Sequence, residues 1–159
     1  MQAIVAVYEN WGIGKDGSQP VVVSADRRHF RELTQGGTVI LGRKTLEDFP
    51  GGQPLKGRRN VVLSRTVAEI PGATVCSSPA EALFTVFDQK DCFLIGGAKV
   101  YRQMLPFCNK VHVTKLYVSP DCDAFFPDLD ADPEWECKEE GPLQEEEGVK
   151  FRFLTYERT

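Results

Sequence analysis

One acidic residue, Asp26, occupies a position from which a carboxyl group could take part in proton chemistry. Asp26, Phe30 and Leu33 are spaced by four and three residues, which places them on one face of a helix. The two apolar partners predict an inward-facing side, where burial raises the pKa of a carboxyl while the helix N-terminus lowers it. A buried carboxylate needs hydrogen-bond donors, which a cationic or amidine-like ligand would supply. For this position alone, an ordinary aspartate in a first helical turn is the commoner interpretation.

Three segments that follow apolar runs have features suited to phosphate groups. Gly96-Gly97 opens a helix, and its backbone could approach an anion closely. Arg43-Lys44-Thr45 starts a short helix, where cations are unfavourable unless an anion is bound. Ser64-Arg65 joins a hydroxyl to a guanidinium. Together they could bind a nucleotide with an extra phosphate at the carboxyl ends of parallel strands. Tight packing of the glycines and ordinary surface charge are the competing interpretations.

Two other segments are suited to ligand binding but indicate little in isolation. Arg58 follows the turn Pro54–Gly57 and could bind a carboxylate through two guanidinium nitrogens. Residues 11–14 (WGIG) come directly after the first apolar run, where a mobile lid would sit. Alone, the first is a loop arginine and the second is a turn. The absence of a G-x-G-x-x-G pattern disfavours an ordinary Rossmann dehydrogenase.

Length and composition restrict the class of protein. The 159 residues, 42% of them hydrophobic, fit one domain, residues 1–159. No apolar stretch approaches the roughly 18 residues of a membrane span, and residues 1–8 are typical of a first strand and not of a signal peptide. The net charge of −4 disfavours a nucleic-acid partner. Five scattered cysteines indicate reduced thiols and a cytoplasmic protein, and two isolated histidines argue against a catalytic metal.

The charged residues are unevenly distributed along the chain. Residues 15–65 contain ten Lys or Arg against five Asp or Glu, whereas residues 121–147 contain one Lys against twelve acids. A basic region within an acidic protein can focus a positive field on a small anion. A solvated surface of uneven charge explains the same pattern, and composition alone favours this second explanation.

The secondary-structure elements that would position these residues alternate between strands and helices in the first part of the chain. In the last part of the chain only strands are expected. Apolar runs predict strands at 2–8, 38–41, 60–64, 73–76, 92–95, 110–117, 135–140 and 149–157. Helices are expected from Ser24, as N-cap, to the Gly36-Gly37 stop, near 43–45, at 79–87 and at 98–105. Residues 9–19 and 50–57 are expected as loops, and 141–148 as an acidic turn. This order predicts an α/β fold with a largely parallel sheet and an antiparallel edge.

In combination these segments closely resemble the dihydrofolate reductase family. They share its order and spacing over nearly the whole chain, and the block 39–65 and the IGG-x-x-x-Y pattern are the specific parts. The resembling segments are IVAV (4–7), NWGIG (10–14), SADRRHF (24–30), VILGRKTLEDFPGGQPLKGRRNVVLSR (39–65), FLIGGAKVY (93–101), VHVTKL (111–116) and FFPDL (125–129).

The resemblance implies one domain with a central, mostly parallel eight-stranded sheet, an antiparallel C-terminal edge and flanking helices. It implies a cytoplasmic monomer that binds NADPH and dihydrofolate in a cleft across the sheet. The reaction would reduce 7,8-dihydrofolate to 5,6,7,8-tetrahydrofolate, for one-carbon and thymidylate metabolism, without a metal. Asp26 matches the active-site acid, Thr114 the residue that supports it, and Arg58 the clamp for the substrate's α-carboxylate. The implied substrate-binding set is Ile4, Val5, Ala6, Asp26, Phe30, Leu55, Arg58, Ile95, Tyr101 and Thr114.

The resemblance also implies a cofactor site, and two nearby arginines favour NADPH over NADH because the 2′-phosphate needs cations. Its residues would be Ala6, Ile13, Gly14, Arg43, Lys44, Thr45, Leu63, Ser64, Arg65, Ile95, Gly96, Gly97, Ala98, Lys99, Val100 and Tyr101. Val21 stands where many bacterial members have Trp, and Gln19 where Met or Leu is frequent. Two alternatives remain: a reductase of another pterin or a pyrimidine, as in the riboflavin pathway, and a non-catalytic nucleotide-binding protein.

Overall fold

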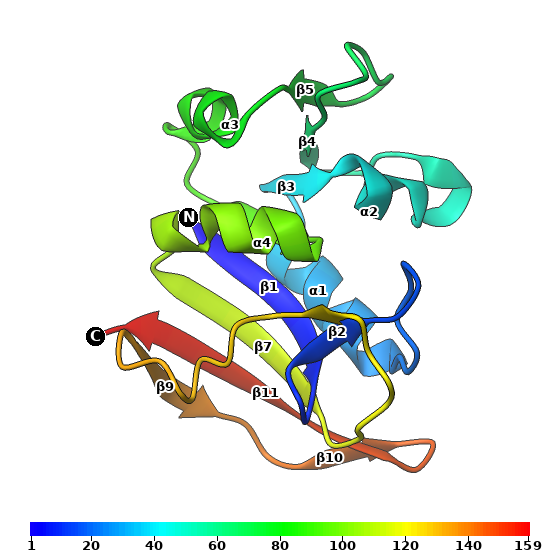
Figure 1. The fold of residues 1–159 in the computed structure, drawn as a ribbon, viewed down its shortest axis with the longest axis vertical. Helices are drawn as coiled ribbons and strands as arrows, with labels where there is room; N and C mark the ends of the chain where they lie inside the picture. Colours follow the sequence, from blue (N-terminus) through cyan, green and yellow to red (C-terminus); the bar gives the residue numbers. More distant parts are fainter.

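The computed structural model describes all 159 residues (Figure 1). The strands of the chain are β1 (Gln2–Tyr8), β2 (Gly12–Gly14), β3 (Thr38–Gly42), β4 (Arg59–Leu63), β5 (Thr74–Cys76), β6 (Cys92–Gly96), β7 (Lys110–Leu116), β8 (Ala124–Phe125), β9 (Trp135–Glu140), β10 (Gln144–Glu146) and β11 (Val149–Arg158). The helices are α1 (Ser24–Thr34), α2 (Arg43–Glu47), α3 (Pro79–Val86) and α4 (Ala98–Met104), with short 3₁₀ turns at Pro50–Gly52 and Leu105–Phe107. None of these helices is both long and apolar enough to cross a bilayer.

The main sheet confirms the expected parallel α/β architecture with an antiparallel edge. Its order is β10-β11-β7-β1-β6-β3-β4-β5. The strands from β7 to β5 pair in parallel, and β11 pairs with β7 in the antiparallel direction. A ninth strand, β9, pairs with residues 154–158 of β11, while β10 pairs with residues 149–151. The sheet therefore has nine strands in eight positions across. The expectation of a plain turn at 141–148 is wrong, because this segment contains β10, whose polar sequence carries no apolar alternation.

Helices cover both faces of the sheet. In Figure 1, α4 lies in front of β1 and α1 lies behind it. The alternation of β1 follows this arrangement: Val5 and Val7 are buried in the cluster that includes Val100 and Met104 of α4, whereas Tyr8 packs with Val23, just before α1. Each such buried side chain contributes about 1.5–3 kcal/mol, so a one-residue slip of β1 would be costly.

Helix α1 begins differently from the prediction. Val23, not Ser24, has the extended backbone of an N-cap residue, and it offers no side-chain acceptor. Ser24 is the first helical residue, and its hydroxyl donates to Glu146 instead. The predicted end is confirmed, because Gly36 follows the helix with φ +79°, a conformation that glycine adopts without strain.

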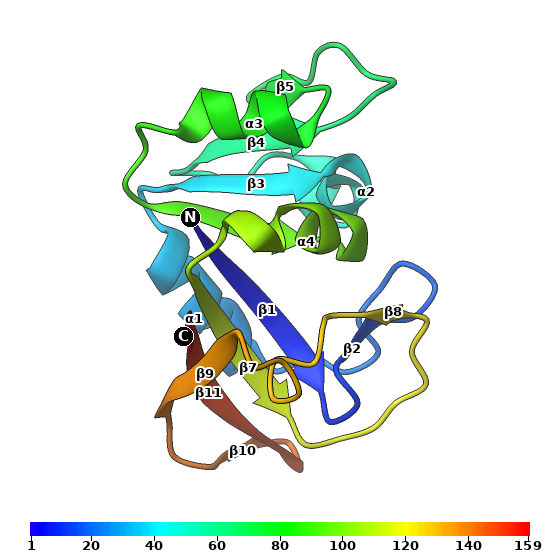
Figure 2. The ribbon, with the colours of Figure 1, turned by 60° about the vertical axis from the view of Figure 1, so that its left-hand side comes forward.

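The sheet opens between its two central strands. β1 and β6 pair only at Gln2–Phe93 and Ala3–Leu94, although both strands continue beyond these residues. In Figure 2 the arrows of β3 and β1 diverge, with β3 running toward α2 and β1 toward β2. The chain also changes direction across the sheet at this point, since β3 and β4 lie on one side of β1 and β7 on the other. Such a switch point is where ligands bind in open α/β sheets.

Candidate active site

Asp26 is half-buried in the first turn of α1 and is close to β7. Burial is the main influence on its carboxyl and raises its pKa. Hydrogen bonding from Thr114, a residue only 2% exposed, lowers the pKa in part, and the charges of nearby His29 and Arg27 act in the same direction. The net shift is upward. Of the competing influences on this acid, desolvation therefore prevails.

The opening between β1 and β6 adjoins this acid. In the β1–β7 ladder Ala6 pairs with Thr114 and Ile4 with His112, so Ala6 is the direct neighbour of the residue bonded to Asp26. The hydroxyl of Tyr101, from α4, donates to the carbonyl of Ile4. Tyr101 is close enough for the charge of Asp26 to raise its pKa, in addition to the larger effect of burial.

On the other side of the opening lies the Gly96-Gly97 turn. This turn contains a cis peptide bond and leads from β6 into α4. A Cβ on Gly97 would lie 3.4 Å from the hydroxyl of Thr45, and a Cβ on Gly96 would lie 3.6 Å from both that hydroxyl and the hydroxyl of Tyr101. The two glycines therefore keep a small backbone-lined cradle free of side chains. Thr45 and Tyr101 are brought to it from different elements, as the resemblance implies.

The cationic segments meet at the ends of β3 and β4. Gly42 pairs with Leu63, so Arg43 and Ser64 leave the sheet side by side. Arg43 donates to the hydroxyl of Thr66 at 3.2 Å and forms an ion pair with Glu47 at 3.3 Å. A recess of about 310 Å³ lies beside them. Its lining residues are Ser64, Arg65, Thr66, Val67, Ala68, Val75, Ser77 and Glu81.

Thr66 and Ser77 of this recess were not predicted as site residues. Ser77 immediately precedes Ser78, the N-cap of α3, whose hydroxyl accepts from the amide of Glu81 at 3.1 Å. The serines and proline at 77–79 therefore gave a helix-start signal and no separate ligand signal. Lys44 and Lys99 are exposed, Thr45 and Ala98 are half-buried, and Val100 is buried in the core behind α4.

Arg58 is half-buried and lies against the last turn of α1. It donates to the hydroxyl of Thr34 at 3.1 Å and to the carbonyl of Lys56 at 2.9 Å. Burial and, to a smaller extent, the charge of Arg31 lower its pKa. Two neighbouring guanidinium groups at one end of α1 form a suitable environment for an anionic group. The sequence does not predict a role for Arg31, because its helical position faces away from Asp26.

The apolar side chains expected around a substrate are divided between two clusters on the α1 side of the sheet. Leu55 and Ile95 pack on the cluster of Val39 and Leu41, and Ala6 packs on the cluster of Tyr8. Ala6, Ile13, Phe30, Leu55 and Ile95 are only half-buried, whereas Ile4 and Val5 are buried. Half-buried apolar surface beside a switch point is available to a ligand.

The 11–14 segment is ordered against the body of the protein. Ile13 lies in β2, which pairs with β8, and the carbonyl of Gly14 accepts from the amide of Asp123 at 2.9 Å. Trp11 is buried, and its ring stacks on that of Phe126 with 6.4 Å between the ring centroids. The prediction of a mere turn is therefore incomplete, because this segment is one strand of a small two-stranded sheet next to the end of β1.

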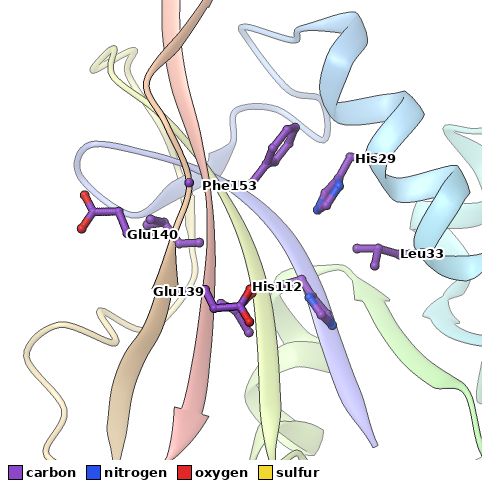
Figure 3. Close-up of a pocket in the computed structure, with 9 residues that line it drawn as sticks. His29, Leu33, His112, Glu139, Glu140 and Phe153 are labelled. Atoms are coloured by element: carbon purple, nitrogen blue, oxygen red, sulfur yellow. The ribbon is translucent and has the colours of Figure 1, made fainter.

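A second recess lies between α1 and the strands β7, β9 and β11 (Figure 3). Leu33, expected to share the face of Asp26 and Phe30, lines this recess of about 370 Å³ instead. His29 from α1 stacks on Phe153 from β11 with 4.0 Å between ring centroids. His112 from β7 completes this wall, and its Nε2 lies 2.6 Å from Oε1 of Gln2. Both histidines of the chain thus lie in one recess.

The recess has a consequence for the pH dependence of stability. Burial lowers the pKa of His112 to about 4. In the unfolded chain, His112 binds a proton below its ordinary pKa of about 6.5, whereas in the folded protein it stays neutral down to about pH 4. Neutral His112 therefore contributes fully to stability above pH 6.5, and this contribution is lost as the pH falls toward 4. As the pH is lowered from 6.5 to 4, we expect the free energy of unfolding to fall less steeply in His112→Gln than in the wild type. Urea denaturation at each pH measures this free energy.

His29→Gln is the matched control for this experiment. Burial also lowers the pKa of His29, but the charges of Asp26 and Glu32 oppose the shift. The control should therefore flatten the stability profile less than His112→Gln does. Equal slopes for the wild type and His112→Gln would contradict the prediction.

No three His, Cys, Asp or Glu side chains gather in the arrangement of a metal site. All five cysteines are free: Cys76, Cys92 and Cys108 are buried, Cys122 is half-buried and Cys137 is exposed. The site therefore consists of one acid, a glycine turn, and flanking cations and hydroxyls.

A parallel sheet that opens at its switch point, with an acid on one side and glycines and cations on the other, is the architecture of a nucleotide-dependent α/β enzyme. The family model described as Dihydrofolate reductase matches residues 1–158. The chain belongs to the dihydrofolate reductase family.

Two bacterial relatives and a solved structure agree with this assignment over almost their full length. The chain is 34% identical over 158 residues to a dihydrofolate reductase of Bacillus subtilis, covering 98% of this chain and 92% of the relative. It is 39% identical over 157 residues to that of Haemophilus influenzae, covering 98% and 96%. The solved structure of Enterococcus faecalis dihydrofolate reductase complexed with NADP(H) and RAB-propyl is similar, with a TM-score of 0.88, 30% identity and coverage of 99% and 95%.

Proposed function

We propose that Asp26, Arg58 and the residues around the Gly96-Gly97 turn carry the reaction of this family in this chain. That reaction is the NADPH-dependent reduction of 7,8-dihydrofolate to 5,6,7,8-tetrahydrofolate, which supplies one-carbon and thymidylate metabolism. The observation that supports these roles best is the half-buried carboxyl of Asp26, with a raised pKa, across the β1–β6 opening from the glycines. Purified protein is expected to oxidise NADPH, as lost absorbance, only when dihydrofolate is present.

Asp26 has the properties that a pterin ring requires of its partner. Its carboxylate can accept hydrogen bonds from the amino group and the ring N–H, a paired geometry that strengthens charge-assisted bonds. Thr114 fixes the carboxylate from the sheet side. A negative charge at this position favours protonation of the ring at N5, and water delivers the proton because the acid binds the opposite edge of the ring.

The residues at the strand ends fit NADPH. The cradle at Gly96 and Gly97, which a Cβ would fill toward Thr45, can admit a pyrophosphate close to the backbone. Arg43 and Arg65 flank the hydroxyls of Ser64 and Thr66, a donor set suited to a 2′-phosphate. When bound, NADPH supplies the hydride that reduces the pterin.

Replacing Arg65 should therefore weaken the preference for the phosphorylated cofactor. Arg65→Ala is expected to raise the KM for NADPH roughly tenfold, the equivalent of one lost hydrogen bond to a charged group, and to leave the KM for NADH unchanged. Steady-state assays with both cofactors measure this, and Lys90→Ala, an exposed cation beyond α3, is the control. An equal rise for both cofactors would remove Arg65 from the 2′-phosphate contact.

We further propose that the chain acts as a cytoplasmic monomer of one domain, with small molecules as its partners. Five unpaired cysteines support a reducing compartment. The net charge of −4 supports the absence of a nucleic-acid partner. Size-exclusion chromatography with light scattering is expected to give the mass of one chain, 17.8 kDa.

A further inference from the structure

We propose that Glu146, on β10, is a positioning residue that sets the place of Asp26 in the active site. This proposal rests on the role of Asp26 in the proposed function. Glu146 lies 120 residues from Asp26 along the chain, in the acidic segment between β9 and β11. It does not touch the reacting atoms and would act through the first turn of α1.

One carboxylate provides the cap that α1 lacks. The backbone N–H of Ser24 donates to Oε2 of Glu146 at 2.6 Å. The Ser24 hydroxyl and the Ala25 N–H donate to Oε1, at 2.8 and 3.1 Å. Val23, at the N-cap position, has no side chain that could accept these bonds. A distant residue therefore satisfies the free amides that a helix start leaves open.

These contacts lie directly before the acid. Ala25 precedes Asp26, and the amide of Asp26 donates to the carbonyl of Val23 at 3.2 Å. The segment before the helix is held separately, since the hydroxyl of Tyr8 donates to the carbonyl of Val21 at 2.7 Å and accepts from its amide at 2.9 Å. With its preceding segment held by Tyr8, the first turn of α1 is hydrogen-bonded to the late strands through Glu146, beside the apolar packing of Val23 and Ala25 in the cluster of Phe151.

The β10–β11 hairpin connects this cap to the partner of Asp26. Glu146 pairs with Val149 at the start of β11, and further along β11 Phe153 pairs with Thr114 on β7. One hairpin thus holds the helix that carries the acid and also pairs with the strand that carries its hydrogen-bond donor. The distance between Asp26 and Thr114 depends on this hairpin.

The charges around α1 predict the direction in which the pKa of Asp26 changes when Glu146 is removed. Hydrogen bonds from Ser24 lower the pKa of Glu146, so it is ionised at neutral pH beside the positive end of α1. Without Glu146 the first turn loses its hydrogen bonds to β10 and keeps only the apolar packing of Val23 and Ala25, so it can shift relative to β7 and weaken the Thr114 bond. Because that bond lowers the pKa of Asp26, its loss raises the pKa further. The activity limb governed by Asp26 then moves to higher pH.

The test compares Glu146→Ala, Glu146→Gln and Glu145→Ala in the full-length protein. Glu145 is the matched control, an exposed glutamate that precedes Glu146 in the same strand and pairs with Lys150 of β11. We expect Glu146→Ala to lower kcat severalfold, move the Asp26 limb of the pH profile upward and leave the KM for NADPH unchanged. Glu146→Gln should give a smaller shift, because its amide oxygen can still accept from Ser24 and Ala25. Glu145→Ala should match the wild type.

Two outcomes overturn the inference. A Glu146→Ala protein with a lowered melting temperature but a wild-type pH profile would make Glu146 a helix cap only. Should Glu146→Ala not fold, Glu146→Gln decides in its place, and a wild-type pH profile there has the same meaning. Asp26→Asn separates this inference from the proposed function: full activity in Asp26→Asn rejects the function, whereas an inactive Asp26→Asn beside a normal Glu146→Ala rejects only the positioning role.

Discussion

Replacing Asp26 with asparagine is expected to lower turnover at pH 7 by about 100-fold or more and to leave NADPH binding nearly intact. Asparagine keeps the size of the side chain but carries neither the proton nor the negative charge, and such a positioned group typically contributes 10²–10⁴-fold. The Gly96-Gly97 turn and the strand-end cations of the cofactor site lie across the β1–β6 opening, so their contacts are unaffected. Turnover is measured by NADPH absorbance and binding by quenching of protein fluorescence.

The pH dependence of this variant distinguishes loss of chemistry from loss of folding. At acidic pH the substrate can take its proton from solvent, so the deficit of Asp26→Asn should shrink as the pH falls. The exposed Asp88, beyond α3, provides the control variant Asp88→Asn, which keeps an acceptor for Gln89. Wild-type turnover of Asp26→Asn at pH 7 would exclude this carboxyl from the mechanism.

Arg58→Ala is expected to raise the KM for dihydrofolate by roughly 10- to 100-fold with a smaller change in kcat. The range corresponds to about 1.5–3 kcal/mol, the usual contribution of a hydrogen bond to a charged group. Arg58 is already oriented by Thr34 and Lys56, and Arg31 lies close, so an incoming carboxylate relieves the repulsion between two cations. Arg58→Lys should recover only part of the loss, because an ammonium cannot form the paired contact.

A substrate without a carboxylate makes this variant decisive. The KM for a dihydropterin that lacks the glutamate tail should be the same in the wild type and in Arg58→Ala. Arg59→Ala, at the exposed start of β4, is the matched control and should change neither KM. An unchanged KM for dihydrofolate in Arg58→Ala would favour a reductase of another pterin or a pyrimidine.

The sequence predicts well those features that depend on local periodicity. Asp26 and Phe30 share a face because a helix repeats every 3.6 residues, and both are half-buried as that spacing requires. The glycines at 96 and 97 follow a buried strand, and the strand register then brings Gly96 beside Leu41. The meeting of the three phosphate-suited segments at one sheet edge likewise follows from parallel strand order.

Features that depend on distant contacts could not be predicted in this way. Ser24 has the ideal residue type for an N-cap, but a carboxylate 122 residues away displaces it from that role. The sequences of β1 and β6 do not indicate the opening between them, because both are continuous apolar runs. The position of Leu33 in the recess between α1 and the strands β7, β9 and β11 depends on how α1 crosses these strands.

The histidines in that recess give the protein an internal spectroscopic reporter. The chain has only two histidines, so its proton NMR spectrum contains two imidazole C2–H resonances, both from the wall of one recess. His29 follows Asp26 by one helical turn. Burial lowers the pKa of His29, and the charge of Asp26 opposes this shift. The chemical shift of His29 therefore registers the ionisation of the acid across the titration, without isotopic labelling or an added probe.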